Sequence, residues 1–596
     1  MRQSVSGAFD YKLDAFNTIF FNAIYNHRND WENRFRLRYI LDEPNEDGIV
    51  EEGEIRRQTK GGSADNDNRR LEDQRTWRTG LSGDHLFGNV KLDWGFSFAK
   101  ASEERPNERY MEFRAKKVPV TVDLSDEREP YFSENHPLSS YSLKDLSEEN
   151  QYTDEKDFNA KVNFEIPFSI NKNLNSSLQF GGKYKKKDKK RDNELFEYEP
   201  LSGFENLTDV PTQDFTDSDF EAGNYKVGSI GTSEFLGSLD LNNAALFEKS
   251  EDVSDKAGNF NATEKVLAGY AEFKHEFSEK LSMIAGLRLE RTEIEYTGFE
   301  FDEEEETLTP TSGSDDYTNI LPGVHFKYNV SDNTILRFAW TNTISRPNYF
   351  SLVPYRNIAE DNEELSIGNP ALEPTTSMNF DLMAENYFES VGILSAGVFY
   401  KKINDFIYTQ KIENYIDPVS GNTYDDFFQP KNGAEATLLG FEFAIQRRLD
   451  FFEGFLRNLT FYANYTFTNS TADNPQINES KGSDETIDLP GTSPHTLNTA
   501  LMYEDSKISL GISFNYSDSY IDPDELDFTP GLERYYDAVT YLDITGSYKF
   551  TDQFTFFFEA NNLLNQPLRY YAGDKDRTYQ AEYYDRKFTA GIKFDL

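Results

Sequence analysis

Residues 338–407 read FAWTNTISRPNYFSLVPYRNIAEDNEELSIGNPALEPTTSMNFDLMAENYFESVGILSAGVFYKKINDFI, and this stretch decides the fold. Leu336, Phe338 and Trp340 alternate with more polar neighbours, which is the period of a strand with one apolar face. Four X-Pro pairs between 346 and 374 then break the pattern, because proline cannot donate to a β-ladder. Two more alternating runs follow, at 378–384 and 394–400, with a tight turn predicted near Glu389 and Ser390. The unit is strand, long loop, strand, tight turn, strand, and its repetition predicts a closed antiparallel barrel.

The composition excludes several classes of protein. The 596 residues carry a net charge of −44, which is incompatible with ordinary nucleic-acid binding because that requires a basic surface. There is no run of 18 apolar residues, so we expect no transmembrane helix. A membrane-spanning β-barrel remains open, since only every second residue of its strands meets lipid. Aromatic residues make up 15% of the chain, more than a soluble acidic protein needs, and cysteine is absent.

The alternating pattern recurs along the whole chain, and we expect about nineteen strands, most of them able to supply the ~9–11 residues that a tilted membrane strand needs. The alternating runs are residues 5–11, 19–39, a segment that ends at a turn at Gly83-Asp84-His85, and then 90–98, 158–164, 178–184, 267–273, 281–289, 324–328, 336–340, 378–384, 394–400, 439–445, 459–467, 497–503, 508–516, 542–548, 554–560 and 588–596.

The connections between these runs alternate between short and long. We expect long loops at 42–70, from about 99 to near Asp154, and, longest of all, at 199–262. Residues 19–39 keep one phase and are predicted to form one long strand that projects beyond the bilayer, with a turn at 26–30 as the alternative. Short turns on one rim and long loops on the other are typical of outer-membrane barrels. The alternative is a large soluble acidic β-protein such as a secreted adhesin.

An odd number of strands conflicts with the even number found in single-chain bacterial barrels. The first strand leads into a short turn and the last strand ends on the same rim, so an odd number of strands is expected upstream. The first residues, MRQSVSGAFDYKL, contain no apolar core of a signal peptide. We therefore expect residues 1–596 to form one all-β domain, an outer-membrane barrel that is incomplete at its N-terminus.

Several segments of the second half resemble the barrel of TonB-dependent receptors, the plugged transporters of the Gram-negative outer membrane. The most specific are RPNY at 346–349, GNPALEP at 368–374 and FYKKINDFI at 399–407. Supporting matches are GLRLE at 286–290, LPGV at 321–324, SPH at 493–495 and NNLLN at 561–565. Each is weak alone, but together they occur in the right order.

The resemblance implies a transmembrane antiparallel β-barrel of the 22-stranded plugged-transporter type. Three strands, the plug domain and the segment that contacts TonB would then lie upstream of the nineteen strands of this chain. The implied function is active import of a scarce solute, bound by extracellular loops and moved with energy from the TonB complex. Lumen-facing polar residues such as Arg288, Glu290 and Glu385 would suit contact with a plug or with water.

Two other functions are weighed against active import. A passive porin or diffusion channel needs no plug. An outer-membrane hydrolase needs a Ser/His pair near the rim that nothing in the sequence suggests, so we do not expect an enzyme. The solute stays open between a siderophore, haem, cobalamin and a glycan, and a surface lipoprotein lid is a further partner to consider beside outer-membrane lipid.

Ligand capture is expected in the long loops, because loops carry function on a rigid scaffold. Aromatic and amide side chains there suit glycan stacking or a chelate, although aromatics are equally common in the interfacial girdles of barrels. The candidate ligand-binding residues are Arg346, Asn348, Tyr349, Tyr355, Arg356, Asn357, Tyr535, Tyr536, Tyr570 and Tyr571.

One basic run stands out in this acidic chain, KYKKKDKKR at 183–191. It continues a strand toward the long-loop rim, where its cations could pair with lipopolysaccharide phosphates; the alternative is an ordinary solvated strand end. The candidate contacts are Lys185, Lys186, Lys187, Lys189, Lys190 and Arg191.

Acidic clusters recur in the long loops, and carboxylates at this density can bind Ca²⁺, although none has EF-hand spacing. Solvated loop charge is the alternative interpretation. The clusters are Asp123–Glu129, Asp214–Glu221, Asp302–Glu306, Asp361–Glu364 and Asp522–Asp527. The six histidines show no metal-ligand spacing, so we predict no resident metal or other cofactor beyond that possible Ca²⁺.

Overall fold

The computed structural model describes residues 1–41, 45, 48–171, 174–216, 226–302, 305–359, 364–388, 392–473, 486–523 and 533–595. Within these residues, no helix has the length and apolarity needed to cross a membrane. The predicted tight turn at Glu389 and Ser390 lies outside the described residues.

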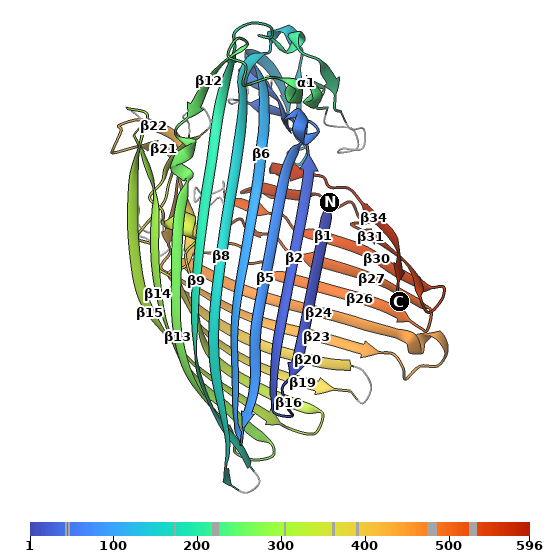
Figure 1. Cartoon of the computed structure of the whole chain (residues 1–596). Helices are drawn as coiled ribbons and strands as arrows, with labels where there is room; N and C mark the ends of the chain where they lie inside the picture. The colour runs from blue at the N-terminus through green and yellow to red at the C-terminus, as the bar shows by residue number, and fades with distance from the viewer. Residues whose placement is uncertain are drawn as a thin grey trace.

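One large antiparallel sheet dominates the structure (Figure 1). Nineteen of its strands pair in chain order, as predicted, and five additional ones bring the sheet to 24. The nineteen are β1 (Arg2–Lys12), β2 (Asn17–Glu32), β5 (Arg70–Phe87), β6 (Val90–Asp123), β8 (Ser142–Asn171), β9 (Leu174–Pro200), β13 (Phe260–Glu276), β14 (Leu281–Asp302), β15 (Thr307–Asn329), β16 (Thr334–Ser345), β19 (Thr375–Tyr387), β20 (Gly392–Asn404), β23 (Glu435–Arg448), β24 (Leu459–Asp473), β26 (His495–Glu504), β27 (Ile508–Ser517), β30 (Val539–Lys549), β31 (Phe554–Asn561) and β34 (Lys587–Phe594). The five are β3 (Arg34–Ile40), β4 (Ile49–Gly62), β7 (Tyr131–Glu134), β12 (Phe247–Asp252) and β25 (Thr486–Ile487).

Smaller elements lie in the long connections. They are the pair β10 (Thr212–Asp214) and β11 (Ser229–Gly231), one four-stranded sheet of β17 (Arg356–Ala359), β18 (Glu364–Ile367), β21 (Ile407–Ile416) and β22 (Thr423–Asn432), and a second of β28 (Tyr520–Ile521), β29 (Arg534–Tyr536), β32 (Leu568–Ala572) and β33 (Thr578–Glu582), with the helices α1 (Ser233–Ser238) and α2 (Tyr349–Leu352). The nineteen main strands are joined at two rims in alternation, by short turns on one and by nine other connections on the opposite one, which we call the long-loop rim. The connections of the long-loop rim carry all three small sheets.

The main sheet has one apolar and one polar face. Residues paired across strands share a face, so Phe21, Leu81 and Phe96 lie side by side, and each is 43–50% exposed. Leu510 and Ile512 on β27 are likewise 44% and 43% exposed. Large apolar side chains do not form such an exposed face in water, whereas lipid accepts them. We call this the outward face and the opposite, polar one the lumen face.

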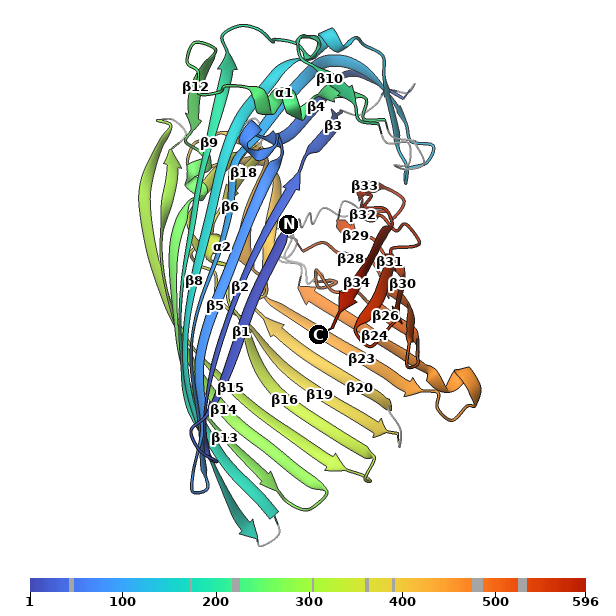
Figure 2. The ribbon, with the colours of Figure 1, turned by 45° about the vertical axis from the view of Figure 1, so that its right-hand side comes forward.

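The curved sheet is open along one line (Figure 2). In the described part of the chain, the edges of β1 and β34 each pair on one side only, β1 with β2 and β34 with β31. Because neighbouring strands alternate in direction, the first and the nineteenth run the same way. An antiparallel closure between them therefore requires an odd number of strands in the opening.

Three strands are much longer than the membrane requires, and two of the predicted loops are wrong. β6 has 34 residues, β8 has 30 and β9 has 27, and all three rise far beyond the rest of the wall (Figure 1). The predicted loop at 42–70 contains β4, and most of the predicted loop from 99 to 154 belongs to β6 and β8. These segments resemble loops in sequence because many charged residues lie between their apolar residues and obscure the alternation.

The projecting strands keep a core of their own. Met111 and Phe113 on β6 and Ile55 on β4 are 0–1% exposed and pack with Leu236 of α1. Thr59 donates to the carbonyl oxygen of Gly231 at 2.5 Å. Residues 201–216 and 226–246, here the cover segment, thus fold over the apolar face of these strands. The long connection predicted at 199–262 is confirmed, since β9 ends at Pro200 and β13 begins at Phe260, and it contains β10, β11, α1 and β12.

Two predictions near the N-terminus also need correction. Residues 19–39 neither form one strand nor turn at 26–30, since the chain breaks only at Asn33 where β2 ends and β3 begins. The break exists because β2 pairs with β5 whereas β3 pairs with β4. The turn predicted at 83–85 lies at Gly88-Asn89, where Gly88 takes a φ of +65° that other residues rarely adopt.

Candidate functional site at the mouth and in the lumen

The four predicted loop tyrosines come together in the sheet of β28, β29, β32 and β33, but on opposite faces. Tyr535 and Tyr571 stack with ring centroids 5.0 Å apart. Tyr535 packs against the apolar core that contains Phe406, and Tyr571 is 7% exposed, so this pair faces the protein interior. Tyr536 and Tyr570 meet edge to face at 5.2 Å on the other face.

The second face forms an aromatic surface that we call the tyrosine face: Tyr520, Tyr536, Tyr570, Tyr579 and Arg534. The Arg534 guanidinium lies 4.4 Å from the centre of the Tyr570 ring and 5.0 Å from that of Tyr579, and it forms an ion pair with Asp522 at 2.7 Å. Burial, followed by the neighbouring Tyr541, raises the pKa of Tyr536 to about 12, so its hydroxyl stays protonated. The surface offers ring faces and one cation, which suits stacking of a planar or ring-shaped ligand.

This sheet is tied to the opposite end of the open wall. The turn after β6 reaches it, and the Thr578 hydroxyl donates to the carbonyl oxygen of Arg128 at 2.6 Å. Asp537 lies 3.5 Å from the Arg128 guanidinium and 2.7 Å from that of Arg569. The two sides of the opening are therefore bridged at the long-loop rim (Figure 2).

Two of the predicted ligand residues at 346–357 form hydrogen bonds with other residues of the barrel and its loops. Arg346 turns to the lumen face, where it binds the carboxylate of Glu290 at 2.5 Å and the hydroxyl of Thr292 at 3.1 Å. It lines a lumen cavity of about 600 Å³ together with Arg288, whose guanidinium also lies 2.5 Å from Glu290. The Asn348 side chain caps α2 by accepting the Phe350 amide at 3.1 Å.

The next two residues belong to the core beneath the loop. Tyr355 is 7% exposed and stacks on Phe350 at 4.2 Å, and burial raises its pKa to about 12. The Arg356 guanidinium binds Asp417 at 2.8 Å. Burial opposes ionisation of Asp417, but hydrogen bonds from Ser420 and then from Arg356 outweigh it and lower its pKa to about 2.

The remaining two candidates here are half-buried. Tyr349 begins α2, and burial, then the nearby Glu264 carboxylate, raises the pKa of its hydroxyl. Asn357 lies on β17, opposite Ser366. Their roles in ligand binding stay predictions.

The basic run at 183–191 lies in β9, as predicted, and alternation divides it between two faces. Lys186 and Lys190 lie on the outward face and pair with Asp188 at 2.9 Å and Asp192 at 2.6 Å. On the lumen face, Lys187 pairs with Glu155 at 2.6 Å. The lumen-facing members of the predicted set are Lys185, Lys187, Lys189 and Arg191.

The acidic clusters are only partly described. Asp123 and Asp126 accept backbone amides of the turn after β6, at 2.9 and 3.0 Å, and Asp214 accepts one at 2.9 Å. In the described part of the chain, no three carboxylates or histidines are placed to hold a metal ion. Residues 217–221, 303–304, 361–363 and 524–527 of these clusters lie outside the described residues. Calcium binding stays a prediction.

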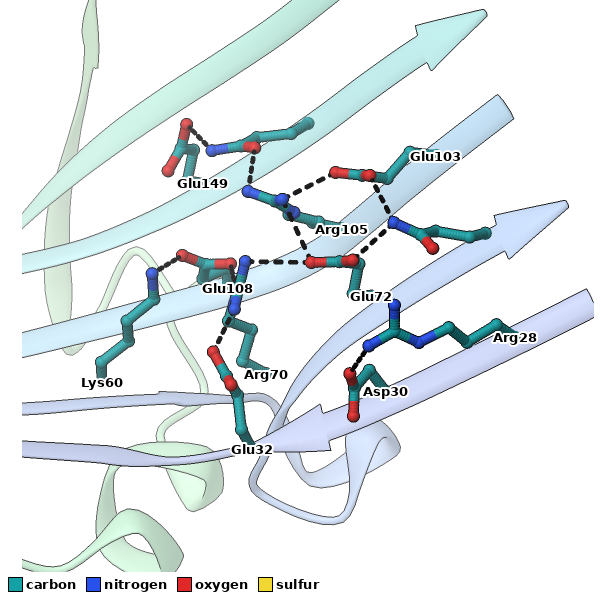
Figure 3. A network of polar contacts seen from close by, with 12 residues as sticks. Arg28, Asp30, Glu32, Lys60, Arg70, Glu72, Glu103, Arg105, Glu108 and Glu149 are labelled. Atoms are coloured by element: carbon teal, nitrogen blue, oxygen red, sulfur yellow. Dashed lines mark hydrogen bonds and ion pairs between the residues drawn. The ribbon is translucent and has the colours of Figure 1, made fainter. Parts of the chain in front are cut away.

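An ion-pair network on the lumen face was missed in the sequence (Figure 3). Glu108 is 1% exposed and lies 2.6 Å from both Arg70 and Lys60. Arg105 binds Glu72 at 3.1 Å and Glu103 at 2.7 Å. The signal that could have revealed the network is acid and base at every second position of neighbouring strands.

The comparisons with known proteins agree with this geometry. A family model described as TonB dependent receptor-like, beta-barrel matches residues 112–563. The ferric-catecholate import receptor Fiu from K12 E. coli aligns with 100% of this chain and 81% of its own, at 11% identity and a TM-score of 0.53. The siderophore receptor PiuA from Acinetobacter baumannii (79% of its chain, 12% identity) and the copper transporter OprC (79%, 12%) each align with all of this chain at a TM-score of 0.51.

None of the curated proteins compared with this chain is similar to it in sequence. At 11–12% identity the solved structures show the fold alone. The family model, in contrast, covers well over half of the residues. The chain belongs to the TonB-dependent receptor-like β-barrel family, and it is the barrel of an outer-membrane receptor.

Proposed function

We propose that this barrel serves an active importer, which captures a scarce solute on the tyrosine face and passes it through the lumen with energy from TonB. The observation that carries the proposal is the placement of that face. Tyr536 lies beside Tyr541, whose strand position points into the lumen, so the aromatic surface overhangs the channel mouth. A ligand bound there is already at the entrance.

We further propose that a segment outside residues 1–596 completes the barrel and plugs it. Unpaired strand edges are costly in a bilayer, because each exposed amide or carbonyl lacks a partner. The opening between β1 and β34 takes an odd number of strands, and three give the 22 strands of plugged transporters. A wide lumen without a plug would breach the permeability barrier. The neighbours named above include a siderophore receptor and a copper transporter, which supports a metal chelate as the solute.

The capture site is tested on the full-length receptor in detergent. A ferric catecholate, haem, cobalamin and a neutral oligosaccharide are titrated and binding is followed by fluorescence. For whichever of these ligands binds, we expect the double variant Tyr536→Ala/Tyr570→Ala to lower the affinity at least tenfold. Tyr548→Ala is the matched control, because Tyr548 lies on the outward face of β30 and is 40% exposed. Unchanged affinity in the double variant contradicts the capture site.

Energy coupling is tested in cells. Uptake of the ligand that binds should stop in a strain that lacks TonB. Uptake that continues at the same rate without TonB, and rises linearly with solute concentration, identifies a passive porin instead.

A further inference from the structure

The lumen has two chemically different walls. The wall from β2 to β19 carries dense ion pairs: the network around Glu108, the Arg346–Glu290 pair, and a two-bond pair of Arg337 with Glu385 at 2.9 and 3.1 Å. Hydrogen bonds between ionised groups are worth about 1.5–3 kcal/mol each and are directional. Such groups hold a fixed partner well.

The opposite wall, on β24, β26 and β27, presents mostly uncharged amides and hydroxyls. Glu504, the last residue of β26, is its charged lumen-facing residue and lies at the short-turn end. Between residues 460–470, 496–502 and 509–517, its lumen-facing side chains are Thr460, Tyr462, Asn464, Thr466, Thr468, Ser470, Thr496, Asn498, Ala500, Met502, Ser509, Gly511, Ser513, Asn515 and Ser517. All of these positions are described in the structure, and none carries a charge.

Three asparagines form a ladder across this wall. Asn464 faces Asn498, and Asn498 faces Asn515, in the register of three adjacent strands. The Asn498 amide donates to the side-chain oxygen of Asn464 at 2.9 Å, and Asn464 in turn donates to the Tyr462 hydroxyl. Within the described part of the chain, the Asn515 side chain has no hydrogen-bond partner, so the ladder ends on an amide that is available to a passing molecule.

We propose that the solute crosses the barrel along this asparagine wall, while the ion-pair wall holds the plug; the inference rests on the proposed function. A neutral hydrogen bond contributes about 0.5–1.5 kcal/mol net, because it replaces one to water. A row of such weak sites lets a molecule bind, leave and bind again, which passage through a channel requires. The chemistry fits a solute whose surface presents uncharged hydroxyl or amide groups.

The chain contains no cysteine, so single cysteines report directly on access. Asn515→Cys places one on the asparagine wall, beside Tyr516. Thr76→Cys places one on the ion-pair wall, at lumen-facing Thr76 beside Trp77, without removing an ion pair. Both are made in the full-length receptor, and Asn498→Cys is a second reporter on the asparagine wall. Heat-dependent gel mobility confirms folding of each variant.

Intact cells whose growth depends on the receptor are treated from outside with a small neutral maleimide, with and without functional TonB. We expect Asn515→Cys and Asn498→Cys to label at least tenfold faster with TonB than without, and Thr76→Cys to label slowly in both strains. TonB-dependent labelling of Thr76→Cys instead, or of both walls equally, overturns the route but leaves active import intact. Rapid labelling of every position without TonB means that no plug is seated, and it overturns the proposed function and the route together.

Discussion

Removing the Asp417 carboxylate should loosen the small sheet of β17, β18, β21 and β22 without touching the main barrel. Asp417 is 1% exposed and follows β21 directly. Its Oδ2 accepts from the Ser420 amide at 2.7 Å, the Ser420 hydroxyl at 2.6 Å and Arg356 at 2.8 Å. Asp417→Asn keeps the shape but removes the charge from all three contacts.

The magnitude follows from the pKa of Asp417, which falls from 3.8 to about 2. At about 1.36 kcal/mol per unit, the folded sheet favours the ionised form by roughly 2.5 kcal/mol. The Asn variant also takes the Asp417 carboxylate away from the buried Arg356 guanidinium, so this figure is a lower bound. If the sheet opens locally, amide exchange there should accelerate by about 70-fold or more.

The assay is hydrogen exchange of the receptor in detergent, read by mass spectrometry. Peptides from 407–432 should exchange faster in Asp417→Asn, and peptides from β26 should not change. Arg356→Gln should accelerate the same peptides. The reasoning is refuted if exchange at 407–432 is unchanged in both variants, above all if Arg356→Gln then abolishes ligand binding, because Arg356 would be a ligand contact after all.

The pH dependence has a defined sign. A carboxyl with a lowered pKa stabilises the fold fully above its unfolded pKa, near 3.8, and loses that contribution as the pH falls through about 2. The exchange difference between wild type and Asp417→Asn should therefore be equal at pH 7 and pH 5.5. Below pH 3.8 it should shrink, and a difference that vanishes already at pH 5.5 contradicts the assignment.

Two further predictions use matched pairs. Lys186→Gln with Lys190→Gln, both on the outward face, should lower the lipopolysaccharide that co-purifies with the receptor, whereas lumen-facing Lys185→Gln should not; equal retention in all variants removes the lipid contact. Gly368→Ala would place its Cβ 1.7 Å from a backbone carbonyl oxygen and should lower the yield of folded receptor, while Gly323→Ala, with no atom nearer than 3.8 Å, should express normally.

The strand count could be predicted from sequence because lipid imposes a strict period of two. Ile508–Ser517 is found by its apolar side alone, and all nineteen wall strands carry that signal somewhere. Outside the membrane the apolar residues are fewer and are mixed with charged ones, so β4 and the upper part of β6 look like charged loops. Arg109 and Glu148, 2.8 Å apart, are an example of a pair whose attraction is visible only once the strands are in register.

The candidate site, too, could be predicted from the sequence only in part. The tyrosines of β29 and β32 could be predicted to cluster, because consecutive long loops share a rim. Which of these tyrosines faces a core could not be predicted. Tyr535 and Tyr536 are adjacent and point to opposite faces of their strand, and the sequence does not show which face is buried. The ion pair of Arg356 with Asp417 could not be predicted either, because the two residues are 61 positions apart and belong to different hairpins.

The two faces of the strands that project beyond the membrane have different surroundings. Their outward face leaves lipid and enters water, so apolar residues that continue there need protein cover. Ile55, Met111 and Phe113 receive it from the cover segment, and the Arg109 guanidinium anchors that segment by donating to the carbonyl oxygens of Leu236, Gly237 and Leu239 at 3.0–3.2 Å. The lumen face meets water or a plug throughout and keeps its ion pairs unchanged. The long connection after β9 is therefore long because one face of the projecting sheet must be covered, whereas the proposed capture site lies on other connections, those from β27 to β30 and from β31 to β34.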